Sequence, residues 1–198
     1  MTDDRLLDAL FATIATEGWR GVTLGRLAAA SGEAASSLAA RFPSRLGLLR
    51  LHGAHVAELV AAGTVPDPAA TPRDRLFDVL MRGLDALQPH RAGMQRLTQE
   101  MWRDPVLAVA LGEVLRRTMA RFLEAADISA SGPAGAARVA GLTLVWLRAV
   151  NAWSKDESED LGTTMAELDR VLGRADQAAR SFGLAGGAQP AQGNDAPD

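Results

Sequence analysis

Cysteine and tyrosine are absent from the 198 residues, and Lys155 is the only lysine. Without cysteine the chain can form no disulfide, no cysteine-ligated zinc site and no thiol nucleophile. With no lysine elsewhere it has no GxxxxGK[ST] phosphate loop. No uncharged apolar run approaches the roughly 20 residues that span a bilayer, and acidic residues stand where a signal peptide would have its basic region. We therefore expect a cytoplasmic protein with no integral membrane segment.

The charge balance gives no global attraction to nucleic acid. The formal net charge is -3, with 23% charged and 47% hydrophobic residues, which is ordinary for a globular protein. Any contact with nucleic acid would therefore depend on a local basic patch.

Apolar residues recur at helical spacing along the chain, and no segment is typical of a strand. A first helix has an apolar stripe from Leu6 to Ile14 and stops at Gly18. Thr23 can cap a second helix, and Gly32 suits the left-handed position after it. The further helices are expected over residues 24–30, 33–41, 45 onward, 71–88, 90–103, 104–127, 136–154 and 161–182.

These patterns predict an all-α protein of about nine helices. A three-helix unit with a helix-turn-helix comes first, and a larger helical bundle for ligand binding and dimerisation follows. Two prolines near residue 67 mark the junction between them. We predict a helix-turn-helix unit over 1–64, a linker over 65–70, a helical domain over 71–182 and a disordered tail over 183–198.

Residues 5–60, above all the segment VTLGRLAAASGEAASSLAARFPSRLGLL, resemble the N-terminal domain of the TetR family of bacterial transcription regulators. The matching positions, in the family's order and spacing, are Val22-Thr23, Leu27-Ala28, Gly32, Leu38 and Phe42-Pro43-Ser44-Arg45. The resemblance implies a homodimeric repressor that binds double-stranded operator DNA and is released by a small apolar ligand. It also implies that the third helix lies in the major groove, while the second and fourth helices hold phosphates at their N-termini.

Carried over by position, Thr23 and Arg45 would contact phosphates, and three residues would reach base edges, namely Ala35, Ser36 and Ser37. The chain departs from the family at Ala35, where a lysine is usual, and at Ala39 and Arg41, where aromatic residues are usual.

Residues 1–64 contain six arginines and six acidic residues. Because phosphate neutralisation drives affinity, this neutral unit would have to bring Arg26, Arg41 and Arg45 onto one face. A helix-turn-helix that serves only packing is the alternative.

Residues 145–172, VWLRAVNAWSKDESEDLGTTMAELDRVL, are similar to the C-terminal part of the TetR-like lipid-binding proteins that assist ubiquinone biosynthesis. This second resemblance implies an alternative function, a lipid-binding accessory protein that contacts membranes peripherally and does not bind DNA. For the acidic run at 156–160 we favour the alternative of a solvated loop that caps the last helix.

Large apolar side chains are abundant after residue 70. Tryptophan and methionine line adaptable pockets well, so the set favours an apolar effector or lipid over a charged one. The predicted ligand-binding residues are Phe77, Met94, Met101, Trp102, Met119, Phe122 and Trp146. A filled core is the alternative.

Apolar residues from Leu161 to Phe182 alternate at spacings of four and three, which is typical of a seam for another helix. Together with the preceding helix this seam predicts a four-helix bundle with a second copy of the chain. The predicted dimerisation residues are Leu142, Val145, Ala149, Trp153, Leu161, Met165, Leu168 and Leu172.

No pattern indicates catalysis, since there is no GxSxG and no paired carboxylate on a recognisable scaffold. His52 and His55 are three apart but lack a further ligand in a known spacing, so we expect an exposed pair. His90 is expected to be a capping or surface residue. The sequence predicts no enzymatic activity, no metal and no cofactor.

Overall fold

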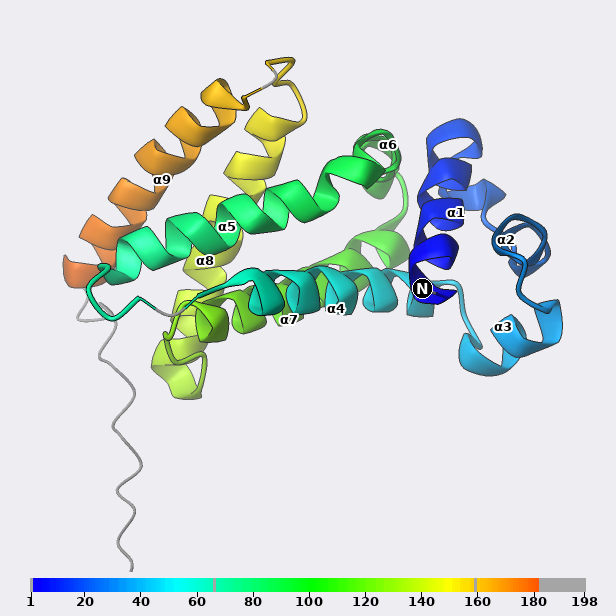
Figure 1. The fold of residues 1–198 in the computed structure, drawn as a ribbon, viewed down its shortest axis with the longest axis horizontal. Coiled ribbons are helices and arrows are strands. Elements are labelled where there is room, and N and C mark those ends of the chain that lie inside the picture. The colour runs from blue at the N-terminus through cyan, green and yellow to red at the C-terminus, as the bar shows by residue number, and fades with distance from the viewer. Residues whose placement is uncertain (1, 66, 159, 182–198) are drawn as a thin grey trace, which may run out of the picture.

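The computed structural model describes residues 2–65, 67–158 and 160–181, and within these ranges the chain contains helices and no strand. Figure 1 shows how the helices are arranged. The described residues form nine α-helices, which are α1 (Thr2–Glu17), α2 (Leu24–Ser31), α3 (Ala35–Arg41), α4 (Leu46–Gly63), α5 (Pro72–Leu87), α6 (Arg91–Met101), α7 (Pro105–Ala125), α8 (Gly132–Trp153) and α9 (Gly162–Ser181). Two 3-10 turns are η1 (Trp19–Gly21) and η2 (Gln88–His90). The all-α prediction with an N-terminal helix-turn-helix is confirmed.

Local signals set most of the helix starts. The Thr23 hydroxyl accepts a hydrogen bond from the Arg26 backbone N–H at 3.4 Å and so caps α2. Gly32 has a φ of 78°, the left-handed conformation in which glycine carries no Cβ penalty. Thr71 and Asp104 cap α5 and α7 in the same manner, accepting from backbone N–H groups three residues on.

Two helix starts differ from the prediction. Helix α3 begins at Ala35 instead of residue 33, because Ala34 is still extended. Helix α8 begins at Gly132, four residues before the predicted start. Pro133 lies in its first turn, where a missing backbone N–H costs nothing, so the proline begins this helix and does not break it.

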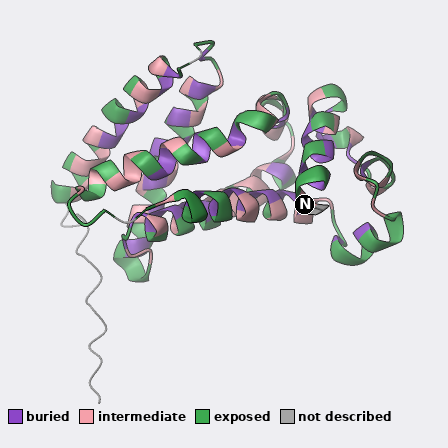
Figure 2. Ribbon diagram, viewed as in Figure 1, coloured by how far each residue is buried: buried purple, intermediate pink, exposed green. Residues whose placement is uncertain are grey.

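Two clusters of buried apolar side chains hold the helices together, shown as the purple stretches in Figure 2. One joins α1–α3 to the first half of α4, and Leu97 of α6 and Leu107 of α7 belong to it. The other joins the second half of α4 to α5, α7, α8 and α9. Because α4 enters both clusters, packing continues across residue 64. The division at 64 remains a prediction, and the predicted tail over 183–198 lies outside the described residues.

The apolar seam of α9 faces its own chain, so the predicted dimer residues need correction. Met165 is half-buried, and the other seven are buried within one chain, namely Leu142, Val145, Ala149, Trp153, Leu161, Leu168 and Leu172. They pack with α5 and α7 in one core. Little of these side chains is therefore left for a contact with a second copy. Phe182, the last residue of the seam, lies outside the described residues.

The predicted ligand-binding set also needs correction, because most of it fills the core. Phe122 and Trp146 meet edge to face with ring centroids 5.5 Å apart. Both rings lie against Gly83, where an added Cβ would come within 2.7 Å of the Phe122 ring. Trp102, by contrast, is 82% exposed at the end of α6.

The other members of the set also lie in or against packed regions. Met119 is fully buried, and Met101 is half-buried. Phe77 and Met94 are partly buried and pack against the core clusters. The buried members pack as the filled-core alternative expects, and a ligand contact by any of the seven stays a prediction.

No helix in the described part of the chain is both long and apolar enough to cross a membrane.

Candidate nucleic-acid interface

Helix α3 presents a small, uncharged outer face at the end of the molecule that α2 and α3 form in Figure 1. Leu38 is fully buried and anchors the helix to the first core cluster. Ala35, Ser36 and Ser37 are exposed, as the predicted role in reaching bases requires. Neither serine hydroxyl has a hydrogen-bond partner among the described residues. This face can therefore offer two free hydroxyl groups to an external partner.

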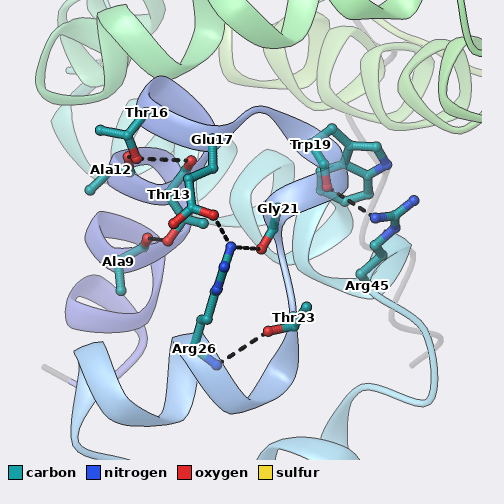
Figure 3. Close-up of polar contacts among 10 residues, drawn as sticks. All are labelled: Ala9, Ala12, Thr13, Thr16, Glu17, Trp19, Gly21, Thr23, Arg26 and Arg45. Carbon is teal, nitrogen blue, oxygen red and sulfur yellow. Dashed lines mark hydrogen bonds and ion pairs between the residues drawn. The ribbon is translucent and has the colours of Figure 1, made fainter.

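The N-terminus of α2 offers backbone donors next to that face. Thr23 is exposed, and its hydroxyl is used for the cap that Figure 3 draws. Because the first N–H groups of a helix lack partners within the helix, those of Leu24 and Gly25 can bind an anion. The geometry fits the predicted phosphate-facing role of this helix end.

Arg26 is held by its own chain. Its guanidinium forms an ion pair with Glu17 and donates to the Gly21 carbonyl at 3.1 Å (Figure 3). The pair is about half exposed, with the Arg26 side chain at 52%. The positive charge therefore faces solvent but is locally neutralised.

Arg41, at the end of α3, is engaged by two carboxylates. It donates to Asp3 at 2.5 Å and to Glu33 at 3.1 Å. The hydrogen bond with Asp3 is the main cause that raises the pKa of Arg41. A phosphate that binds Arg41 would have to compete with both acids.

Arg45, at the start of α4, contacts the turn that precedes α2. It donates to the Trp19 carbonyl at 3.0 Å, and its guanidinium lies 4.8 Å from the centre of the Trp19 ring (Figure 3). Trp19 is buried, and its backbone N–H donates to Glu100 of α6 at 2.8 Å. Arg45 therefore helps to fix the turn between α1 and α2, which in turn is fastened to α6.

Sequence reasoning missed the cations that are free. Arg5, Arg20 and Arg50 are exposed, and none has a carboxylate partner within the described ranges. Simple charge counting could not separate them from the paired arginines. The distinction depends on where Asp3, Glu17 and Glu33 lie in space.

Sequence reasoning also missed a histidine cluster where α1, α4 and η2 meet. His52 is 6% exposed, and its Nε2 lies 3.3 Å from Nδ1 of His90. Nε2 of His90 lies 3.1 Å from Asp8, and the Phe11 ring stacks on His90. Burial lowers the pKa of His52 to about 3, with the nearby His90 as a second cause.

The expectation of exposed histidines is therefore wrong for His52. It lies four residues from buried Leu48 and Val56, so the helical period of α4 could have revealed its burial. In the described part of the chain no group of three or more potential ligands could hold a metal ion.

The acidic run after α8 has a structural role that favours the capping explanation. Asp156 is buried and accepts hydrogen bonds from the Thr164 backbone N–H and hydroxyl, both at 2.7 Å. Ser158 donates to the same carboxylate. Asp156 thus caps the first turn of α9.

Comparison with known proteins gave structural matches only. No family model matches the chain, and no curated protein matches it in sequence. A TetR transcriptional regulator from Nitrosomonas europaea has 20% identity and a TM-score of 0.69, covering 89% of this chain and 99% of that one. One from a Rhodococcus species has 19% identity and a TM-score of 0.61, covering 88% and 94%.

A TetR-family regulator from Streptomyces coelicolor has 15% identity and a TM-score of 0.58, covering 91% of this chain and 83% of that one. The similarity covers the helix-turn-helix and the bundle together, since each match spans most of the chain. The similarity of residues 145–172 to ubiquinone-associated proteins remains a prediction. Helix order, helix-turn-helix geometry and these matches agree, and the chain has the fold of TetR-family transcriptional regulators.

Proposed function

We propose that this protein is a TetR-like transcriptional regulator that acts in the cytoplasm and represses by occupying operator DNA. The observation that carries the proposal is the outer face of α3. Its hydroxyl groups are exposed and have no hydrogen-bond partner in the part of the chain that the structure describes, and the neighbouring helix α2 offers Thr23 and its first N–H groups. In the structural neighbours this fold belongs to transcriptional regulators.

The binding mode follows from the side chains on α3. Serine can bond to a base edge but discriminates poorly, and alanine contributes only apolar contact. Phosphate contacts position the protein, so affinity would be largely electrostatic and depend on salt. To contact phosphates, Arg26 has to break its ion pair with Glu17, and Arg41 has to break those with Asp3 and Glu33. This competition keeps the affinity for DNA moderate.

A homodimer remains part of the proposal, with a revised contact face. The outward side of α8 carries exposed residues at spacings of four, four and three, namely Ala136, Ala140, Leu144 and Leu147. Leu144 is 67% exposed and Leu147 is 48% exposed. We expect glutamate at both leucines to give monomers in sedimentation. The matched control is Leu59→Glu on α4, a leucine as exposed as Leu147 but on another helix.

The function is tested by duplex binding in a salt series, with the DNA that flanks the protein's own gene. Binding should be measurable at low salt and weaken as salt rises. If the wild type binds no duplex at low salt, while liposomes with a ubiquinone-like lipid retain it, the regulator proposal is wrong. The lipid-binding accessory function would then replace it.

A further inference from the structure

An apolar groove lies between α8 and α9, beside the core cluster that joins α4, α5, α7, α8 and α9. Its volume is about 540 Å³, within the range of small-molecule sites. In Figure 1 the two helices meet at the loop that joins them and diverge away from it, toward the start of α5. The apolar lining includes Leu76, Leu123, Ile128, Leu144, Val145 and Ala175. None of the seven ligand-binding residues predicted from sequence lines this groove.

The groove offers real space beside α8. Gly141 lines it, and a Cβ added there would meet no atom within 4 Å. This contrasts with Gly83 in the core, where the same addition would collide with Phe122. A chain-like apolar ligand could therefore lie against α8 without displacing core side chains.

The lining of the groove carries surplus positive charge. Arg148, Arg170 and Arg174 all line it. They surround one carboxylate, Glu167, whose pKa is lowered chiefly by the Arg170 hydrogen bond and also by the charges of Arg148 and Arg174. Arg170 bonds Glu167 at 2.5 Å.

The other acidic residues at this end of α9 are already paired. Asp169 binds Arg73 at 2.6 Å, and Asp176 binds Arg180 at 2.7 Å. Among the described residues, Arg148 and Arg174 therefore have no carboxylate of their own. Two cations in the lining of an apolar groove are complementary to an anion that carries an apolar tail.

We propose that this groove binds a fatty acid, with its tail along the apolar lining and its carboxylate between Arg148 and Arg174. As an effector site the groove rests on the function proposed above, for which it names the ligand class. A second copy of the chain suits the groove less well, because the surplus positive charge is the same on every copy. The outward face of α8 borders the groove and shares Leu144 with it, so the dimer contact proposed above and the groove are adjacent.

The binding test uses three amphiphiles with the same twelve-carbon tail, titrated calorimetrically below their micelle concentrations. We expect dodecanoate to bind one per chain, dodecanol about tenfold more weakly and dodecyltrimethylammonium not at all. Replacing Arg148 and Arg174 by glutamine should weaken dodecanoate about tenfold and leave dodecanol unchanged. Arg103→Gln is the matched control, since Arg103 is also exposed, has no carboxylate partner within the described ranges and lies outside the groove.

A matched pair of glycine variants tests the location. Gly141→Leu should fill the groove and abolish dodecanoate binding. Gly112→Leu, on an equally open face of α7, should bind dodecanoate like the wild type. Because both changes replace a helical glycine in open space, neither should unfold the protein.

Several outcomes would overturn the proposal. They are equal binding of the three head groups, full dodecanoate binding by Gly141→Leu, or binding only to phosphatidylglycerol vesicles. Loss of the dimer in Gly141→Leu without dodecanoate binding by the wild type would instead make the groove part of the dimer contact. The titrations contain no DNA, so their failure is distinct from failure of duplex binding.

Discussion

Removing the acidic partner of Arg26 should strengthen DNA binding. Glu17→Gln breaks the ion pair that neutralises Arg26 and leaves that guanidinium only the Gly21 carbonyl. If Arg26 then contacts one more phosphate, the salt slope of log affinity should steepen by about 0.9. One such contact corresponds to an affinity gain of about eightfold at 0.1 M salt relative to 1 M.

The assay is fluorescence anisotropy of a labelled duplex at several salt concentrations. The control is Glu124→Gln, which changes the net charge equally but lies at the far end of α7. The control should leave the slope unchanged. An unchanged slope in Glu17→Gln, or an equal gain in the control, would refute the idea that Glu17 restrains Arg26.

Three further predictions concern stability. Asp156→Asn removes the charged cap of α9 and should lower the melting temperature by about 2–4 °C. Hydrogen bonds hold the Asp156 pKa below its usual range, so the difference in stability between wild type and variant should shrink below about pH 4. Because burial lowers the pKa of His52, the unfolded chain binds a proton there before the folded chain does. The free energy of unfolding of the wild type should therefore fall by about 2 kcal/mol from pH 6.5 to 5, as measured by urea unfolding. His52→Gln should make this fall smaller. Gly83→Ala should cost about 1–3 kcal/mol through collision with Phe122, whereas Gly112→Ala should not destabilise; equal stabilities would contradict the packed core.

Helix ends and the helix-turn-helix were predictable because their signals are local. A hydroxyl or carboxylate three residues before its backbone donor specifies a cap at Thr23, Thr71 and Asp104, wherever the helix packs. The left-handed φ of Gly32 likewise specifies the end of α2 without any distant contact. The order of helices follows from these signals and the apolar period.

The direction in which a helix faces was not predictable. The Leu161–Leu172 seam has the same period whether it packs on its own chain or on a second copy. In the structure Leu161, Leu168 and Leu172 are buried against their own chain. Trp102 and Trp146 look alike in sequence, yet one is exposed and the other fills the core. Periodicity identifies an apolar face but not its partner.

Contacts between side chains that are far apart in the sequence were also not predictable from it. Arg41 and Asp3 are 38 residues apart, as are His52 and His90. Counting charges over 1–64 predicts a neutral unit correctly, but it cannot tell that Arg41 is paired while Arg20 has no carboxylate partner among the described residues.

The central claim is that α3 meets the bases of a duplex, and the absence of cysteine allows a direct test. Ser37→Cys creates a unique thiol that can carry a photoreactive crosslinker. With a bound operator duplex and light, we predict crosslinks to bases from Ser37→Cys and none from Ser131→Cys, an exposed serine just before α8. Duplex binding without base crosslinks from Ser37→Cys, or equal crosslinking from both positions, would contradict the account.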